Sequence, residues 1–579
     1  MRHTIRIRSI TLMVYLFLFI LCFALTTKAE DQLEVLYSFT DPARPLTYYH
    51  SDEPVLIPKE PKEYKYYFKA AYVLTRDNLD FPRMERTSSQ DMVESFKQAY
   101  KKLLDTFMEN HINVIIFEIR PLLDAFYPSS YNPWSQFLIG TEGQFVEDWD
   151  PLAFMIEEAH ARRMEFHGYV NAFLVSTEPL GGREKEAILS TLSASNFARN
   201  HEEYVFVGAD DRLYLNPAEQ TVIDHFLQTV EELITGYDLD ALHLDTSFYP
   251  SGGFVGNLDY QLLTDEEKAI YQTVEQYRVE QVNNLLDKLE RLMNRYKPSM
   301  QLGMTIHDDA PYIDESRLFY YADYIIPKLN ARFESAPKGY ADLLREWAEK
   351  FTVSQSVQRM RPNLYIGFDP HFESHDYKRE LESYFRLHQL YDEIQGVAFY
   401  GLPALADHKD YPTFQQVMTG FYASAYFLPP VPVFEAEENL LPAPAFEVKR
   451  VNGGIQISWS HRKQYKNLAK YYVLYRVKST DELIPIEEIL HPDHIVKIFL
   501  NDPTKDSYTY IDYDVKNHEK YKYALTVIDR ANRETELPYV IDYDLSIATN
   551  QAAVIALFII TSVIGLAVIV ISSYRVLKD

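Results

Sequence analysis

The chain has 579 residues, which is long enough for one large domain and at least one smaller one, each with its own hydrophobic core. It carries 57 Lys and Arg residues against 84 Asp and Glu residues, a formal net charge of −27 at pH 7. A charge this negative repels nucleic acid and anionic lipid head groups, and no basic stripe in the sequence offsets it. The composition therefore excludes nucleic acid as a partner.

The first 29 residues have the pattern of a secretory signal peptide. Three arginines precede an apolar run from Thr11 to Leu25, and Thr27-Lys28-Ala29 supplies a small-x-small cleavage signal. A retained N-terminal anchor is the alternative, but this run is short for crossing a bilayer. Cleavage after residue 29 leaves 53 basic and 84 acidic residues, a net charge of −31.

A second apolar segment, residues 551–573, lies close to the C-terminus. It contains the 20-residue uncharged run Ala552–Ile571, and Arg575 and Lys578 follow in the tail 574–579. The length of the run predicts a transmembrane helix, and its basic flank predicts a cytoplasmic tail. We therefore expect a single-pass protein of the cell membrane whose catalytic part is extracellular.

Cysteine usage narrows the cellular setting. The single cysteine, Cys22, lies inside the predicted signal peptide, so the mature chain has no disulfide although it is exported. Such a chain is more typical of a bacterial cell surface than of an animal secretory pathway.

Residues 30–66 are rich in Asp, Glu, Pro and Tyr without clear periodicity, and we interpret them as an N-terminal linker or strap. From 67 to 428, short apolar runs alternate with helical patterns. Eight runs have the character of buried strands: Lys69–Thr75, Asn113–Ile119, Glu165–Val170, Ala241–Leu244, Gln301–Ile306, Asp323–Pro327, Leu364–Phe368 and Gly396–Tyr400. This alternation predicts an α/β fold, a (β/α)8 barrel of the TIM type. A doubly wound open sheet is the alternative, but no glycine-rich phosphate loop follows the first strand.

Two connections around the fourth strand carry further predictions. The helix before it is expected to begin with Asn216 as N-cap, Pro217 as first residue and Glu219 as capping-box acid, and to close at Gly236. The span 172–214 is long for a link between a strand and a helix, which favours a functional insertion.

The last third of the chain changes character. Five prolines mark residues 429–444 as a linker. Residues 445–545 then contain strand-length runs separated by polar turns: Ile455–Trp459, Tyr471–Val477, Tyr508–Asp512 and Tyr521–Ile528. They predict a β-sandwich that resembles a fibronectin type III module, a module that spaces or binds and carries no chemistry.

The fourth strand carries the first candidate for chemistry. Its apolar run stops at Asp245, so this carboxylate is expected at the C-terminal end of the strand, where barrel enzymes build their active sites. The alternative is that Asp245 caps a loop or pairs with an arginine.

Several longer motifs occur in order between residues 69 and 402. They are AYVLTRDNLDFP, VIIFEIRPLLDAFYPS, WDPLAFMIEEAHARRMEFHGYVN, LDALHLDTSFYP and GVAFY. In these motifs the chain resembles the glycosyl hydrolase-like 10 family of bacterial surface proteins, a (β/α)8 group that includes enzymes cutting peptide-free peptidoglycan strands. The resemblance implies a sugar-processing cleft lined by Asn78, Arg120, Asp124, His167, Asn171, Asp245 and Tyr249.

Three positions depart from the family pattern. Thr246 follows Asp245 where the family tends to have a second aspartate, and Glu118 and Lys328 each stand where it has a glutamine. The first departure argues against activity, whereas Glu118 supplies a new carboxylate.

Glycoside cleavage needs one carboxylic acid to protonate the leaving oxygen and one carboxylate to attack or to activate water. Asp245 is the candidate nucleophile or base. For the acid, Glu118 ranks first because burial at a strand end raises a carboxyl pKa, although Arg120 would oppose this if it turned towards Glu118. Asp124 ranks second, followed by Asp308 and Asp309 or Asp369.

Other polar residues are candidates for binding sugar hydroxyls. We interpret His167 and Asn171 as residues that hydrogen-bond sugar hydroxyls; for His167 the alternative is a position in the core. His243 alternates with Asp245 along the strand, so its side chain is expected on the same inward side of the barrel. The histidines lack metal-ligand spacing and no serine nucleophile elbow is present, so we expect neither metal nor cofactor.

The sequence thus predicts a membrane-anchored extracellular glycoside hydrolase. Its partners would be a poly- or oligosaccharide of the cell wall or another surface glycan, and the membrane itself. The alternative is a catalytically inactive barrel that binds glycan or protein through the same cleft. Thr246 favours the alternative, and the retained polar positions favour the enzyme.

Overall fold

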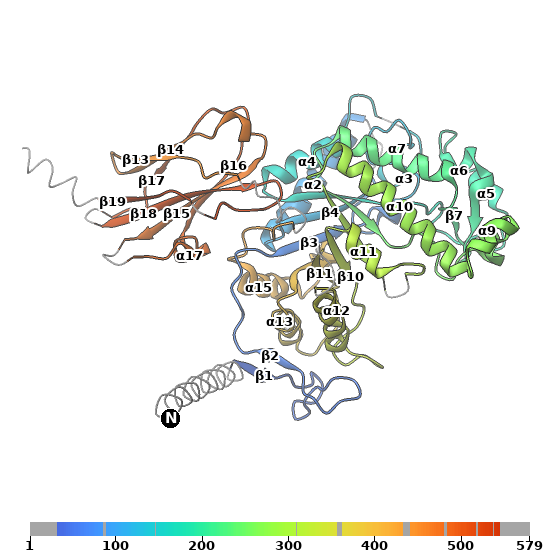
Figure 1. Ribbon diagram of the computed structural model, residues 1–579, viewed down its shortest axis with the longest axis horizontal. Helices are drawn as coiled ribbons and strands as arrows, with labels where there is room; N and C mark the ends of the chain where they lie inside the picture. The colour runs from blue at the N-terminus through green and yellow to red at the C-terminus, as the bar shows by residue number, and fades with distance from the viewer. Residues whose placement is uncertain are drawn as a thin grey trace, which may run out of the picture. The chain divides into compact units, whose positions relative to one another are not determined.

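The computed structural model describes residues 32–84, 89–144, 146–307, 310–355, 362–431, 441–479, 483–516, 519–536 and 538–544. The chain divides into two compact units, with the boundary between residues 434 and 435 (Figure 1). The predicted signal peptide, transmembrane helix and cytoplasmic tail lie outside the described residues. Among the helices that are described, none combines the length and the apolar character needed to cross a membrane.

The first unit is built on a closed barrel of eight parallel strands. They are β3 (Phe68–Val73), β4 (Val114–Arg120), β5 (Glu165–Val170), β8 (Ala241–Asp245), β9 (Gln301–Ile306), β10 (Tyr324–Pro327), β11 (Asn363–Phe368) and β12 (Ile394–Phe399). Consecutive strands pair in parallel, and β12 closes the barrel against β3. The predicted TIM-type barrel is confirmed, and no end of a predicted strand is more than two residues away from the observed one.

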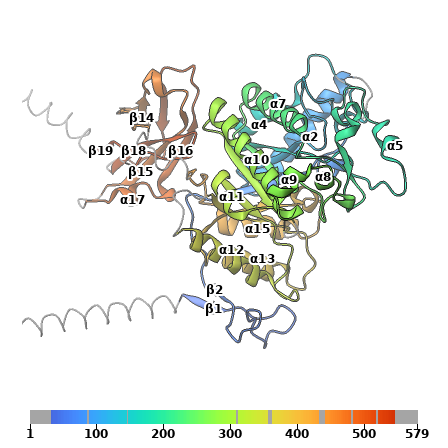
Figure 2. The same ribbon diagram turned by 45° about the vertical axis from the view of Figure 1, so that its right-hand side comes forward.

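Helices lie around the outside of this barrel, as Figures 1 and 2 show. They are α2 (Ser89–Glu109), α4 (Pro151–Ala161), α7 (Gln220–Gly236), α10 (Val274–Tyr296), α11 (Glu315–Tyr321), α12 (Tyr340–Gln355), α13 (Tyr377–His388) and α15 (Tyr411–Tyr422). Each turns an apolar stripe towards the strands; in α2, for example, Phe96, Leu104 and Phe107 are fully buried.

The predicted start of α7 is wrong by three residues. Its N-cap is Glu219 rather than Asn216, because Asn216 forms a turn before the helix: its side chain accepts a hydrogen bond from the N–H of Ala218 and donates one to Glu219 Oε1. The helix ends at Gly236 as expected.

The long connection after β5 has structure of its own. It contains α5 (Lys185–Leu189), α6 (Phe197–Asn200) and a hairpin of β6 (Val205–Val207) and β7 (Leu213–Leu215). It is therefore an ordered insertion rather than an open loop.

The N-terminal segment 32–66 is a strap held against the barrel helices. Its strands β1 (Leu33–Val35) and β2 (Leu56–Pro58) pair antiparallel, and β2 contacts α13. Arginines of the helices fasten it: Arg386 donates to Pro58 O at 2.6 Å, and Arg345 pairs with Glu53 at 3.0 Å.

The barrel interior contains a chain of polar side chains where branched aliphatic residues usually dominate. His167 bonds to Glu165 through Nε2 (2.9 Å) and to the Tyr324 hydroxyl through Nδ1 (2.8 Å). The same hydroxyl bonds to Nδ1 of His243 (3.0 Å), whose Nε2 reaches the Thr305 hydroxyl (2.8 Å). Burial lowers the pKa of His243 to about 3, so its ring is neutral at physiological pH.

The central position of Tyr324 in this chain depends on a glycine. Its hydroxyl joins the two histidines, and its ring fills the space beside Gly303 on the neighbouring strand β9: a Cβ atom at Gly303 would lie 1.9 Å from Tyr324 Cζ. No side chain larger than hydrogen fits at this position unless Tyr324 moves.

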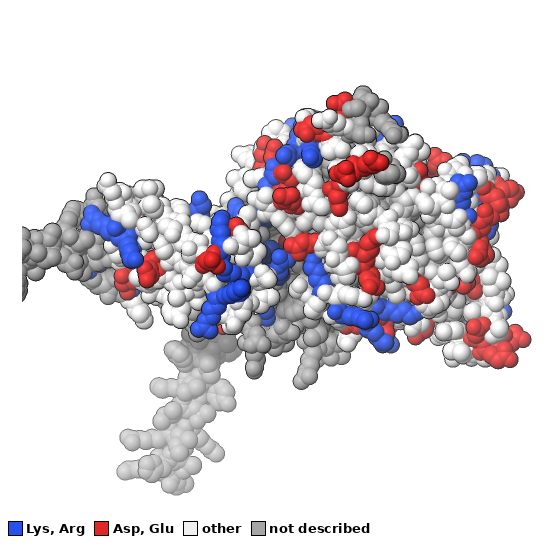
Figure 3. Space-filling view, turned by 90° about the horizontal axis from the view of Figure 1, so that it is seen from above, with Lys and Arg blue, Asp and Glu red and all other residues white. Residues whose placement is uncertain are grey.

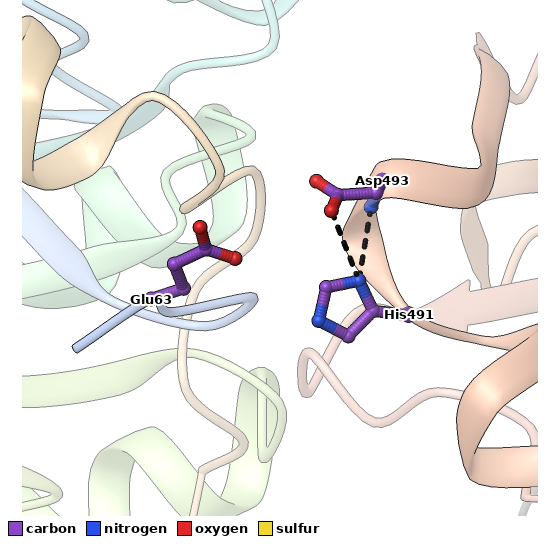
Figure 4. A group of neighbouring side chains, drawn as sticks. All are labelled: Glu63, His491 and Asp493. Carbon is purple, nitrogen blue, oxygen red and sulfur yellow. Dashed lines mark hydrogen bonds and ion pairs between the residues drawn. The ribbon is translucent and has the colours of Figure 1, made fainter.

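The second unit contains two antiparallel sheets. One has β13 (Phe446–Val451), β14 (Gly454–Trp459) and β17 (Tyr508–Asp512); the other has β16 (Ile495–Leu500), β15 (Ala469–Lys478), β18 (Lys520–Asp529) and β19 (Val540–Asp544). Their buried residues form one core, in which the Trp459 ring stacks on Tyr508 at 5.2 Å. A short turn before β16 is capped by His491, whose Nδ1 accepts a hydrogen bond from the N–H of Asp493 at 3.4 Å (Figure 4).

We expect the substitution Gly303→Ala to lower the free energy of unfolding by about 1–3 kcal/mol, because the added methyl group overpacks the barrel interior. It also displaces the Tyr324 hydroxyl from both histidines. Urea unfolding followed by circular dichroism measures the change. The matched control is Gly236→Ala at the end of α7, where an added Cβ meets no atom within 4 Å. Equal stability of the two variants would contradict the packing argument.

Candidate active site at the C-terminal end of the barrel

Asp245 is the last residue of β8 and lies at the C-terminal mouth of the barrel, as predicted. Its Oδ2 accepts a hydrogen bond from the Tyr169 hydroxyl at 3.0 Å and lies 3.7 Å from Nε2 of His307, while the N–H of Ser247 donates to Oδ1. Burial raises the pKa of this carboxyl, but His307 and the Ser247 N–H outweigh burial and bring the pKa below its usual range. The side chain is 18% exposed, so an ionised carboxylate faces the mouth.

Lys328 follows β10 at the same end of the barrel. Its Nζ lies 4.2 Å from the centre of the Tyr400 ring. Burial lowers the pKa of Lys328, and the negative charges of Asp369, Asp245 and Asp80 oppose that shift. One ammonium group therefore interacts with three carboxylates of the mouth.

Asp80 is a carboxylate of this mouth that the sequence analysis did not single out. It lies in the loop after β3, and its Oδ2 accepts a hydrogen bond from the N–H of Leu74 at 2.9 Å. Burial raises its pKa to about 6, with further raising by the charges of Glu118 and Asp369 and lowering by Lys328. Asp80 can therefore hold a proton close to neutral pH, which is what a general acid requires. The only sequence signal was its place after the first strand, in the motif RDNLDFP.

Glu118, on β4, is fully buried. Its Oε2 accepts hydrogen bonds from the N–H groups of Thr75 (2.8 Å) and Arg76 (2.7 Å), and the Arg76 guanidinium lies 4.0 Å from Oε1. Burial raises its pKa, and Arg76 opposes the rise. Glu118 thus connects the loop after β3 to β4 through hydrogen bonds. The Arg76 guanidinium, which lies near Glu118, also interacts with the charge of Asp245.

Asp124 and Arg120 form a separate buried group after β4. Asp124 accepts a hydrogen bond from the N–H of Leu122 at 3.1 Å, and burial raises its pKa to about 7. Arg120 donates to Asn132 Oδ1 at 3.1 Å and to the carbonyl oxygen of Asn171 at 2.5 Å. Arg120 therefore does not turn towards Glu118. Its hydrogen bonds connect the loops that carry Asn132 and Asn171.

The predicted binding residues are distributed over three places. Asn78 and Asn171 hold turns at the mouth: Asn78 Nδ2 donates to Phe137 O at 2.6 Å, and Asn171 Oδ1 accepts from Leu174 N at 2.9 Å. His167 and His243 lie inside the barrel, in the polar chain described above. His243 therefore shares the inward side with Asp245, as expected.

Tyr249 belongs to a cluster behind the mouth. It is fully buried, with its ring 5.5 Å from the Arg278 guanidinium and 5.5 Å from the Tyr312 ring. Arg278 in turn holds Asp259 through two hydrogen bonds of 2.8 and 2.7 Å. This cluster supports the segment between β8 and α10.

Of the remaining acid candidates, Asp308 and Asp309 lie outside the described residues. Asp369 lies after β11, and its Oδ1 accepts a hydrogen bond from the N–H of His371 at 2.9 Å. Among the described side chains of the mouth, no three carboxylates or imidazoles come close enough to share a metal ion. Among the described side chains, Lys328 and Arg76 bring positive charge next to these carboxylates.

The face of the molecule drawn in Figure 3 carries charges of both signs. On the face drawn in Figure 3, Lys and Arg side chains are interspersed with Asp and Glu side chains, and the described part of this face shows no continuous basic stripe.

Several known proteins are similar to this chain. "Glycosyl hydrolase YngK" of Bacillus subtilis is 26% identical over 513 residues, which cover 81% of this chain and 92% of that protein. "Glycosyl hydrolase DigH" of Escherichia coli is 26% identical over 329 residues, covering 52% of this chain and 72% of that protein. Among solved structures, the PgaB glycoside hydrolase domain from Bordetella bronchiseptica has a TM-score of 0.40 at 10% identity, over 61% of this chain and 99% of that domain.

The model of one protein family, glycosyl hydrolase-like 10, matches residues 68–370. The match begins at the first residue of β3 and extends past the end of β11, and it includes Asp80, Glu118, Asp245 and Lys328. Because it covers more than half of the 579 residues, the chain belongs to the glycosyl hydrolase-like 10 family.

Proposed function

We propose that the chain is a glycoside hydrolase that cleaves cell-wall glycan of the peptidoglycan type by two-carboxylate chemistry. The observation that carries the proposal is a pair of carboxyl groups with opposite pKa shifts at one barrel mouth. Asp245 is held ionised, whereas the pKa of Asp80 is raised to about 6. Environments that push the pKa values of two carboxyl groups apart assign them the roles of base and acid.

In the proposed mechanism, Asp80 protonates the glycosidic oxygen as the bond to the anomeric carbon breaks. Asp245 either attacks that carbon or removes a proton from the water that attacks it. The Tyr169 hydroxyl and His307 hold Asp245 in place, and the contacts with His307 and the Ser247 N–H favour its ionised form. We prefer Asp80 to Glu118 as acid because Glu118 is fully buried and already accepts two backbone hydrogen bonds.

Thr246 does not count against activity. Its N–H donates to Thr305 O at 3.1 Å, which continues the pairing of β8 with β9, and its side chain is fully buried. Thr246 lies just past the end of β8, and its buried side chain is not exposed to a substrate at the mouth. An inactive barrel that binds glycan or protein is the second candidate, and the engagement of Glu118 in backbone bonds favours it.

We further propose that the enzyme is exported and anchored in the cell membrane through residues 551–573, with the catalytic unit extracellular. The support is the apolar run Ala552–Ile571 with its basic flank. The second unit, with two antiparallel sheets around Trp459, is proposed to be a fibronectin type III-like spacer.

We expect Asp245→Asn to reduce hydrolysis of peptide-free peptidoglycan strands by about 10²–10⁴-fold, because an amide neither attacks nor accepts a proton. Turnover is measured on a chain of residues 30–550, as the number of new reducing ends that it releases from the strands. Asp392→Asn is the control, since this aspartate side chain is 93% exposed and pairs with the strap residue Lys62. Tight glycan retention without turnover, in wild type and variant alike, would instead support the inactive barrel.

The pH dependence tests the acid. If Asp80 must be protonated, kcat/KM falls as pH rises through about 6. Lys328→Gln removes a positive charge that favours ionised Asp80, so the pKa of Asp80 rises. The alkaline limb of the pH profile of kcat/KM then moves to higher pH by about one unit, which corresponds to about 1.4 kcal/mol. Lys328→Arg keeps the charge and leaves the limb in place. A limb at the same pH in all three proteins would exclude this role of Asp80.

The anchor is tested in a bacterial host. The full chain is expected in the membrane fraction and accessible to external protease, whereas a chain ending at residue 550 is expected in the soluble fraction, because it lacks the apolar run. Recovery of the full chain in the soluble fraction would contradict the anchor.

A further inference from the structure

We propose that a hollow beside the mouth, here called the strap pocket, binds sugar units of the glycan chain beyond the bond that is cleaved. Its volume is about 540 Å³, within the usual range for ligand sites. One wall is the strap, with Phe39 and Thr40, and the others are the loops after β10, β11 and β12. The proposal rests on the proposed function, because it assigns a place to the rest of the same substrate.

The strap pocket is linked to one carboxylate of the mouth, that of Asp369. The loops that line it follow the C-terminal ends of their strands, the end at which Asp245 and Asp369 lie. Asp369 accepts a hydrogen bond from the N–H of His371, whose ring packs against His408 at 4.8 Å, and His408 lines the pocket. In the proposed arrangement, a chain that leaves the mouth passes Asp369 and reaches the strap pocket at this pair of rings.

The barrel side of the pocket is rigid before any ligand binds. Arg332 donates to both carboxylate oxygens of Glu380, at 3.2 and 2.6 Å, and to Glu373 O at 2.7 Å, while Glu380 is only 1% exposed. The guanidinium also lies over the Phe372 ring at 5.2 Å. A wall fixed by a bidentate ion pair costs little conformational entropy on binding.

The strap side is fixed as well. The hydroxyl of Ser38 donates to Glu334 at 2.8 Å, and the Arg44 guanidinium pairs with the same carboxylate. Arg379 lies over the Phe39 ring at 4.6 Å and donates to Ser38 O at 3.0 Å. The strap precedes residue 68 and His408 follows residue 370, so the pocket joins segments on both sides of the family match.

The lining indicates a neutral, hydroxyl-rich ligand. Hydroxyl groups of Thr40, Ser335 and Ser374 alternate with charged groups, which suits the mixed donors and acceptors of sugar hydroxyl and acetamido groups. Carboxylates outnumber Lys and Arg side chains along the lining, which favours an uncharged sugar unit over one that carries a carboxylate. Since the N-acetylmuramic acid units of peptide-free strands carry such a carboxylate, the pocket fits the uncharged N-acetylglucosamine units between them.

The test blocks the pocket from the strap. Thr40→Trp places a large ring in the pocket, whereas Glu60→Trp introduces the same ring at an exposed strap position outside it. With peptide-free strands of graded length, Thr40→Trp is expected to raise KM for long strands relative to short fragments by about tenfold, or about 1.4 kcal/mol. Glu60→Trp is expected to behave as wild type. Lys409→Ala, a smaller change on the opposite wall, is also expected to raise KM for long strands relative to short fragments.

Binding separates failure of the pocket from failure of the proposed function. Affinity electrophoresis in gels containing the same strands is done in the Asp245→Asn background, where no strand is cut. Weaker retention with Thr40→Trp supports the pocket even if wild type shows no turnover, in which case only the hydrolase proposal fails. Turnover with an unchanged length dependence, together with equal retention of all variants, overturns the pocket and leaves the hydrolase proposal intact.

Discussion

The arrangement at the barrel mouth depends on the carboxylate of Glu118. By accepting hydrogen bonds from two consecutive backbone N–H groups, Thr75 and Arg76, it fixes the loop that leaves β3. That loop carries Asp80, which is held in turn by the N–H of Leu74. A buried carboxylate with charge-assisted hydrogen bonds is strongly directional, so Glu118 does more for the site by orienting this loop than it could by reaching substrate.

Two charges of opposite sign act on Asp80 in this setting. Glu118 adds a negative charge to the mouth and Lys328 adds a positive one. The charge of Glu118 raises the pKa of Asp80 and that of Lys328 lowers it. The charges of Glu118 and Lys328 therefore cancel in the net charge of the mouth. The pKa of Asp80 depends on how strongly each of these two neighbours acts on it.

The barrel could be predicted from the sequence because strands buried on both faces leave short apolar runs whose order is independent of side-chain detail. The position of Asp245 followed from the same pattern. The roles of the other candidates could not be predicted in this way. The pattern shows that His167 points into the barrel, but it does not show its partner Tyr324, which lies 157 residues further along the chain. Asp80 was missed because its raised pKa arises from burial by distant loops, which leaves no local pattern.

The strap extends this argument to specificity. A (β/α)8 barrel supplies one mouth, and the length of chain it can hold depends on what its loops and neighbouring segments add. Here segments before and after the family match meet at the loops of β10 to β12, where Glu334 is held by Ser38 and Arg44 of the strap. Because these contacts are ion pairs and hydrogen bonds between fixed elements, the strap acts as a wall of the groove rather than as a closing lid. The chemistry would thus be set by the barrel and the choice of chain length by the strap.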